Sequence, residues 1–258
     1  MINLTDYPLF VLALSFLVLW LSARIGSSLL KRLRNIGEDV REDFGVILSA
    51  TLTLLGLLIG FSFSMAISRY DQRKNYEEAE ANAIGTEYVR ADLLPSADAA
   101  KVRALLRSYT DQRILFYRTR DKQKLLQINA NTGQLQNELW SAVRAPAASQ
   151  STPVIALAIS GMNDVLNSQG YTQAAWWNRI PPEAWGMMVA IAVCCNLLVG
   201  YGTRQAKAQG ILMLVLPLVV SISFFLIADI DSPRGGVIRV RPQNLLSFAQ
   251  SLPANWLS

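Results

Sequence analysis

The sequence has no histidine and only two cysteines, and these absences exclude several kinds of chemistry. Without histidine there is no Ser-His or Cys-His catalytic pair, no imidazole proton shuttle and no histidine-bound metal. Cys194 and Cys195 are neighbours in an apolar run, a spacing that fits neither a zinc site nor a redox pair, so we interpret them as buried side chains. No P-loop or glycine-rich dinucleotide motif is present either. We expect no catalytic residue, no metal and no cofactor.

Charge is also scarce, since 17% of the residues are charged and 52% are hydrophobic. Four segments contain no Asp, Glu, Lys or Arg: residues 7–23, 45–68, 184–203 and 208–228. A helix needs roughly 20 apolar residues to cross a bilayer. We therefore predict an all-α integral membrane protein with four transmembrane helices. The net charge of +5 accompanies no nucleic-acid-binding motif, so we expect the lipid bilayer as a partner and no nucleic acid.

The polar residues define a helical domain inserted between the second and third spans. We predict transmembrane helices 1 and 2 in 1–68, a helical extramembrane domain in 69–182, transmembrane helices 3 and 4 in 183–230, and a C-terminal tail in 231–258. Helix should continue from the second span into the domain, because no proline separates them. Basic residues are balanced between the two faces, so whether the domain is cytoplasmic or periplasmic stays open, although Lys31, Arg32 and Arg34 favour a cytoplasmic first loop.

Within the inserted domain we expect helices near 69–93, 97–122, 123–144 and 151–170. Breaks are predicted at 94–96, 131–133, 145–146 and 152–153, with Ser96 as a helix cap. The second of these helices has the clearest amphipathic stripe, with residues three or four apart: Val102, Leu105, Leu106, Tyr109, Arg113 and Phe116. The tail contains a short amphipathic stretch, 245–252, that we expect on the membrane or on a neighbouring subunit.

The second span carries the most informative pattern. Small and hydroxyl residues recur at steps of three or four and share one helical face: Ser49, Thr53, Gly56, Gly60, Ser64 and Ser68. Such a face allows helices to approach closely, with Gly56 and Gly60 as a GxxxG contact. Alternatively it lines an ion conduit, in which Ile59, Phe63 and Ile67 form an apolar constriction. Both interpretations hold if the protein oligomerises around this helix.

No ionisable residue lies within a span, which favours a passive pore over a proton-coupled carrier. Asp229 and Asp231 end the fourth span, and we expect them to pair with Arg234, Arg69 or Arg73. These five charges form either an interfacial ion-pair cluster or a pore mouth that attracts cations. The charges at 77, 78, 80 and 87 are interpreted as a solvated helix face, with a charged vestibule as the less favoured alternative.

Several of these segments together resemble a known family. They are Gly60-Phe61 leading into Arg69-Tyr70, then Glu78, Glu80 and Ala81, the run from Leu94-Pro95 to Tyr109, and residues 229–236, Asp-Ile-Asp-Ser-Pro-Arg-Gly-Gly. They are similar to the bestrophin-like bacterial membrane family, which resembles true bestrophins in having two spans, a helical insert and two more spans. Bestrophins are pentameric ion channels whose second helix lines the pore. The resemblance implies a homo-oligomer in a bacterial inner membrane that conducts small inorganic ions.

Our leading hypothesis is a passive, homo-oligomeric ion channel with its axial pore built by the second spans. The alternative is a membrane signalling or scaffold protein, in which the long helix from Gly45 to Leu93 transmits movement between the bilayer and the helical domain without ion conduction. A water-filled pore along the axis of the oligomer distinguishes the first hypothesis from the second.

Overall fold

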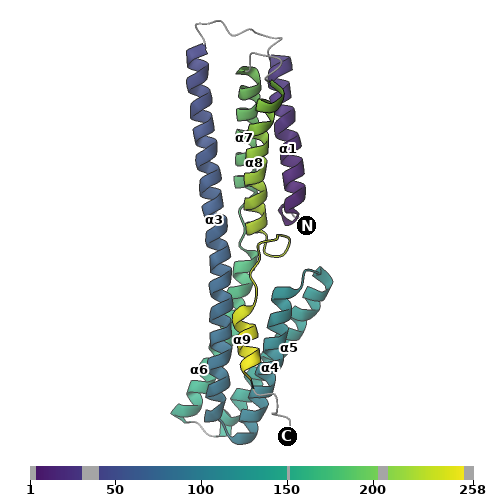
Figure 1. Cartoon of the computed structure of the whole chain (residues 1–258). Helices are drawn as coiled ribbons and strands as arrows, with labels where there is room; N and C mark the ends of the chain where they lie inside the picture. Colours follow the sequence, from purple (N-terminus) through teal and green to yellow (C-terminus); the bar gives the residue numbers. More distant parts are fainter. Residues whose placement is uncertain (1–3, 31–40, 150–151, 203–208, 253–258) are drawn as a thin grey trace. The chain divides into compact units, whose positions relative to one another are not determined.

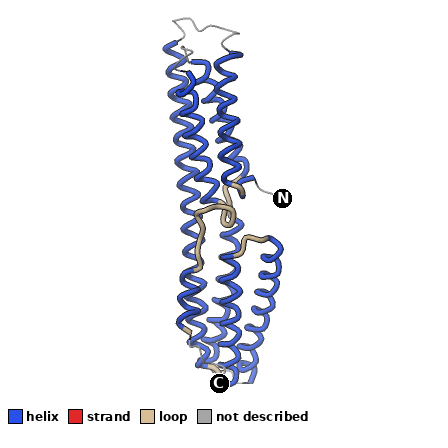
Figure 2. The backbone as a smooth tube through the Cα atoms, turned by 45° about the vertical axis from the view of Figure 1, so that its right-hand side comes forward, coloured by secondary structure: helices blue, strands red, loops and turns tan. Residues whose placement is uncertain are grey.

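The computed structural model describes every residue except 1–3, 31–40, 150–151, 203–208 and 253–258. Each regular element in this described part is helical, as predicted (Figures 1 and 2). The chain divides into two compact units. The first unit contains Met1–Arg69 and Arg179–Arg239, and the second contains Tyr70–Asn178 and Val240–Ser258.

The first unit is built from apolar helices. Its elements are η1 (Leu4–Asp6), α1 (Pro8–Ile25), the π-helical turn η2 (Gly26–Leu30), the first part of α3 (Arg41–Arg90), α7 (Pro182–Gly202) and α8 (Gln209–Asp231). α1 packs against both α7 and α8. Leu19, Met188 and Phe224 are buried in the shared core, and the Trp185 and Phe224 rings meet edge to face at 5.9 Å.

Two glycines allow α1 and α7 to touch backbone to backbone. A Cβ atom on Gly200 would overlap the Ala23 carbonyl, and a Cβ on Gly26 would overlap the Leu197 carbonyl. Small residues at crossings of this kind let membrane helices approach closely. This contact, and not the small-residue pattern of the second span, is the close helix crossing that the first unit uses.

Four helices in the described residues are long and apolar enough to cross a membrane: Pro8–Ser28, Asp43–Leu93, Pro153–Gly202 and Met213–Asp231. Each of them overlaps one of the four predicted spans. The predicted continuation of the second span is confirmed, because α3 is one helix of 50 residues. The loop residues Lys31, Arg32 and Arg34, on which the sidedness argument depends, lie outside the described residues.

The second unit is a helical bundle with its own core. It contains the second part of α3, η4 (Ala91–Leu93), α4 (Ser96–Arg118), α5 (Lys122–Ser149), α6 (Pro153–Trp177) and α9 (Gln243–Ser251). The predicted stripe of α4 is confirmed, since Val102, Leu106, Tyr109, Arg113 and Phe116 are fully buried. Aromatic packing against Trp176 of α6 completes this core, with ring centroids 4.9 Å apart for Phe116 and 5.5 Å apart for Tyr117.

Three local predictions in this unit were wrong. Helix α5 runs through residues 131–133 and 145–146 without a break. Within this helix the Thr132 hydroxyl donates to the Ile128 carbonyl at 2.7 Å. Ser96 does not cap α4, which begins after Pro95 without any side-chain cap. The side-chain cap belongs to α6, where the Thr152 oxygen accepts from the Ile155 N–H at 3.3 Å.

The amphipathic stretch at 245–252, predicted on the membrane or on a neighbouring subunit, packs its apolar side chains within its own chain. It forms α9, whose Leu245 is buried in the core of the second unit, and Leu246 and Phe248 pack against that core. Burying these apolar side chains within the same chain removes the need for an external surface. Helix α9, which falls within the predicted tail, is therefore part of the second unit.

Candidate functional site

The small-residue face of α3 is uncovered within the first unit. The side chains at 49, 53, 64 and 68 are exposed, and a Cβ atom on Gly56 or Gly60 would have no neighbour within 4 Å. Only 6% of the apolar stretch of α3 is buried within the chain, whereas the value is 50% for α8. The GxxxG contact therefore has no partner within the described residues of its own chain.

The opposite side of α3 holds the helix against its neighbours. Leu55 is buried in the core of the first unit, and Leu52, Leu58 and Ile59 are partly buried against it. At about 100° per residue, Leu55 and Leu58 fall on the side of the helix away from the small-residue face, whereas Leu52 and Ile59 lie between the two sides. One face of α3 thus packs within the protomer while the other is left open.

The three candidates for the apolar constriction lie in different surroundings. Ile59 is half-buried and packs against the core of the first unit. Phe63 is half-buried and Ile67 is 38% exposed. Phe63 and Ile67 are therefore closer to the open face than Ile59, and the pore role of all three stays a prediction.

Asp231 is the centre of an ion-pair cluster in the first unit. Its carboxylate lies 3.4 Å from Arg69 Nη1 and 3.5 Å from Arg179 Nε, and it accepts the Ile180 N–H at 3.2 Å. Arg179 also pairs with Asp6. The expected pairing of Asp231 with Arg69 is confirmed, whereas Asp6 and Arg179 were not anticipated. The cluster links η1, α3, the end of α8 and the segment before α7 with two positive and two negative charges.

Asp229 has backbone partners instead of an arginine. Its two carboxylate oxygens accept the N–H groups of Val237 and Ile238, both at 2.8 Å. The loop folds tightly enough that a Cβ atom on Gly236 would overlap the Asp229 carbonyl, and one on Gly235 would overlap the Asp6 carbonyl. The segment 229–236 therefore uses its first aspartate, Asp229, to fix the chain that leaves α8.

The two remaining predicted mouth charges belong to different units. Arg73 is buried in the second unit, where Nε donates to the Ala175 carbonyl at 3.3 Å and Nη2 to the Asn178 carbonyl at 3.5 Å. Arg234 is partly buried in the first unit and has an interaction partner of its own. Of the five predicted charges, Arg69 and Asp231 form a direct pair.

The interpretation of the α3 charges as a solvated face was wrong for three of the four glutamates. Glu77, Glu80 and Glu87 are buried in the second unit, and only Glu78 is exposed. The missed signal is a spacing of four and three, because the buried residues Arg73, Glu77, Glu80, Ile84, Glu87 and Ala91 form one stripe. Apolar residues at the same spacing indicate that the charged residues of this stripe also face the interior of the bundle.

Glu80 is the centre of a polar network inside the second unit. It forms an ion pair with Arg113 and accepts hydrogen bonds from the Tyr117 hydroxyl at 3.0 Å and the Thr172 hydroxyl at 3.2 Å. Burial would lower the pKa of Arg113, but the Glu80 charge outweighs it and the pKa lies above its ordinary value. Burial, together with the Glu80 charge, raises the pKa of Tyr117. The network joins α3, α4 and α6 with its charges paired.

Glu77 fastens α9 to α3. Its Oε1 accepts the N–H groups of Asn244 and Leu245, both at 3.0 Å, and its Oε2 accepts from Asn244 Nδ2 at 2.7 Å. A carboxylate at the first turn of a helix satisfies its free N–H groups and favours its dipole. Burial nevertheless raises the pKa of Glu77, although these hydrogen bonds oppose the rise.

Glu87 is buried differently, because neither carboxylate oxygen has a hydrogen-bond partner. It lies over Gly161 of α6, where a Cβ atom would overlap Oε2. Burial raises its pKa to about 8, opposed by Arg90 and reinforced by Asp164. An unpaired carboxyl with this pKa holds its proton at neutral pH. None of these groups forms a metal site, since no three His, Cys, Asp or Glu residues cluster in the part of the chain that the structure describes.

Comparisons with known proteins identify a matching family model and solved structures of similar fold. A family model described as the Bestrophin-like domain matches residues 9–245. A bacterial bestrophin homologue from Klebsiella pneumoniae is similar with a TM-score of 0.62 and 13% identity, over 95% of this chain and 99% of that chain. A tyrosine-to-alanine variant of a bacterial bestrophin homologue from the same organism has a TM-score of 0.64 and 13% identity, over 92% and 98% of the two chains.

No curated protein matches the chain. At 13% identity the similarity to the solved structures establishes a shared fold, and the four apolar helices together with that fold make this an integral membrane protein. The family model extends from α1 to α9 and so includes both units. The chain therefore belongs to the family of Bestrophin-like domain proteins.

Proposed function

We propose that the protein is a homo-oligomeric ion channel, in which the apolar half of α3 from each protomer lines an axial pore and small ions pass without an energy source. The helices of residues 70–178 lie outside the bilayer, which is the inner membrane of a bacterium. Membership of the Bestrophin-like family supports this function, because the family resembles true bestrophins, which are pentameric channels whose second transmembrane helix lines the pore.

The observation that carries the proposal is the uncovered face of α3. A membrane helix whose small and hydroxyl side chains have no partner in their own chain needs a different neighbour. In an oligomer with α3 at its axis, these residues border either an adjacent α3 or the pore. Apolar lipid chains would be a poor partner for Ser49, Thr53 and Ser64, whose hydroxyl groups favour water or ions.

The hydroxyl at Thr53 supports cations over anions as the conducted species. It donates its proton to the Ser49 carbonyl at 2.8 Å, so its oxygen lone pairs remain for an ion. Oxygen lone pairs replace part of the hydration shell of a cation. The mouth charges Arg69 and Asp231 neutralise each other within the protomer, so their field at the pore is weak.

Single-channel conductance of Phe63 variants tests the pore assignment. Phe63→Ala widens the proposed constriction and raises conductance. Phe61→Ala is the matched control, because Phe61 is on the same helix but about 160° away, and it is 63% exposed. Equal conductance in the wild type and both variants would count against a constriction at Phe63.

A signalling or scaffold protein is the second candidate. It is favoured by the length of α3, a single helix of 50 residues that belongs to both units. In that case α3 transmits movement from the bilayer to the buried charges around Glu80. A stable dimer without a water-filled axis would support this candidate instead of the channel.

A further inference from the structure

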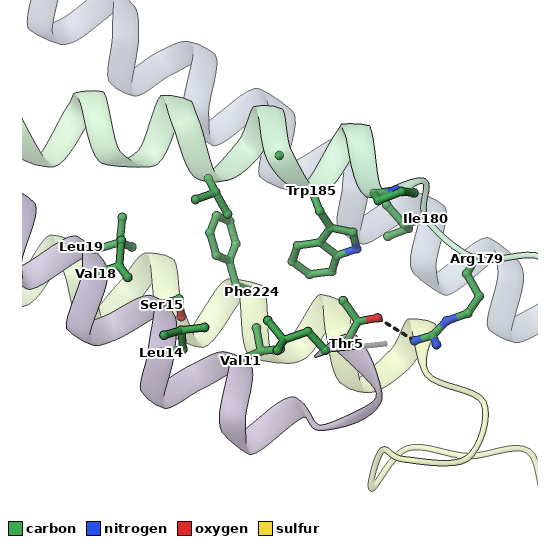
Figure 3. A pocket seen from close by; sticks show the side chains of 14 residues that line it. Thr5, Val11, Leu14, Ser15, Val18, Leu19, Arg179, Ile180, Trp185 and Phe224 are labelled. Atoms are coloured by element: carbon green, nitrogen blue, oxygen red, sulfur yellow. Dashed lines mark hydrogen bonds between the residues drawn. The ribbon is translucent and has the colours of Figure 1, made fainter. Parts of the chain in front are cut away.

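The first unit contains an apolar cavity of about 490 Å³ among α1, α7 and α8 (Figure 3). Its lining includes Val11, Leu14 and Val18 of α1, Trp185 and Val189 of α7, and Phe224 of α8. Pockets for small molecules commonly measure about 300–1,000 Å³. In Figure 1, α7 and α8 lie between α3 and α1, and the cavity is lined without any residue of α3.

One end of the cavity is polar. Arg179 Nη2 donates to the Thr5 hydroxyl at 3.1 Å, and the same guanidinium pairs with Asp6 and Asp231 (Figure 3). These carboxylates neutralise Arg179 and its neighbour Arg69, so this end does not select for an anion. A second donor is unused, because the buried Nε1 of Trp185 has no hydrogen-bond partner. Figure 3 shows that nitrogen on the side of the indole ring that faces Arg179.

The surroundings define the class of ligand. The three helices around the cavity are apolar enough to cross a membrane, and its rim is open at Leu14 and Val189, which are 37% and 38% exposed. A ligand that enters from the bilayer is apolar along most of its length. This ligand carries a hydrogen-bond acceptor near Trp185, and the end of the ligand near Arg179 does not have to be charged. The ester carbonyl and acyl chain of a glycerolipid have these properties.

We propose that this cavity binds one acyl chain of a bilayer glycerolipid, with the ester carbonyl accepting the Trp185 indole N–H. Because bulk lipid is as apolar as the cavity wall, the hydrophobic effect contributes little. Binding depends instead on filling the space among the three helices and on satisfying the buried indole donor. The site is independent of conduction, so it goes beyond the proposed channel function.

Photolabelling of the full-length protein tests the cavity directly. The protein is reconstituted with phosphatidylcholine that carries a diazirine in its acyl chain, irradiated, and the labelled residues are identified by mass spectrometry. We expect labels on Leu14, Val18 and Val189. Gly186→Leu should lose most of this labelling, because Gly186 lines the cavity and its Cβ position is free of neighbours. Val189→Phe is the second filling variant if the first does not fold.

Gly45→Leu is the matched control, since Gly45 also has open space around its Cβ position but lies on α3, away from the cavity. It should keep the wild-type labels. Unchanged labelling in folded Gly186→Leu, or crosslinks from these residues to a second copy of the chain, would overturn the proposal. Loss of ion flux in these variants would concern the channel proposal and would not test lipid binding in the cavity.

Comparison of ester and ether lipids tests the indole bond. Ether lipids have the same chains but no ester carbonyl, so the wild type should retain more ester than ether phosphatidylcholine through purification. Trp185→Phe keeps an aromatic ring but has no donor, and it should retain both lipids equally. An ester preference that survives in Trp185→Phe would exclude the proposed hydrogen bond.

Discussion

At the scale of single residues, the buried charges of α3 are expected to affect the free energy of unfolding most when they are changed. Glu80 and Arg113 are fully buried and paired, so the loss of either charge leaves the other without compensation. Breaking a buried pair in this way costs about 3–5 kcal/mol, whereas an exposed pair contributes about 0–1 kcal/mol. The sequence alone did not predict this difference, because it shows the charges of α3 but not the α4 and α6 residues that cover them.

Glu80→Gln is therefore expected to lower the free energy of unfolding by about 3–5 kcal/mol, because it leaves Arg113 buried and unpaired. Asp92→Asn is the control, since Asp92 is exposed and also pairs with an arginine, Arg103. It should change stability by less than about 1 kcal/mol. Denaturant unfolding followed by circular dichroism measures both, and equal small losses would contradict the buried-network description.

Glu87 predicts a pH dependence of stability. In the folded chain its pKa is about 8, and its ordinary value is 4.5, so unfolding releases a proton between these two pH values. The free energy of unfolding therefore falls as pH rises from about 4.5 to about 8, by an amount on the order of a few kcal/mol. Below this range the Glu87 contribution is constant because the carboxyl is protonated in both states.

Glu87→Gln should remove this slope and be more stable than the wild type above about pH 8. Glu78→Gln, on the exposed side of the same helix, should keep it. Thermal unfolding at a series of pH values from 4 to about 9 checks the prediction. The account of Glu87 fails if the wild type and Glu87→Gln lose stability in parallel across that range.

At the scale of secondary structure, α3 was predicted well and its neighbours less well. Its apolar run and the absence of proline after Ser68 predict one long helix, which the structure contains. The limits of α5 and the packing of α9 were predicted wrongly. Both depend on tertiary contacts, such as the hydrogen bonds from the first turn of α9 to Glu77. Local turn signals are weak when such contacts hold a helix together.

The crossing of α1 and α7 gives a test at this scale. Gly200→Ala adds a methyl group that would overlap the Ala23 carbonyl, so the two backbones must separate. Overpacking of this kind typically costs about 1–3 kcal/mol. Gly186→Ala is the matched control on the same helix, because its Cβ position has no neighbour within 4 Å. Thermal unfolding in detergent should show a lower midpoint for Gly200→Ala alone, and an equal midpoint for the two variants would argue against close backbone contact.

At the scale of the whole molecule, sequence patterns predicted the four apolar helices, and specific segments predicted the family. The open face of α3 was also visible as a period of small residues, but its two interpretations were not separable by sequence. The structure removes the possibility that this face packs against described residues of its own chain. What covers the open face of α3 in the assembled protein depends on how other copies of the chain pack against it. The sequence of one chain does not specify that packing.

The most direct test of the channel is ion flux through the purified protein in liposomes, comparing potassium and sodium with chloride. We predict flux from an oligomer, with a preference for the cations because the Thr53 oxygen presents lone pairs. Absence of flux for every ion, at varied pH, calcium concentration and voltage, would contradict the proposed channel and favour the scaffold.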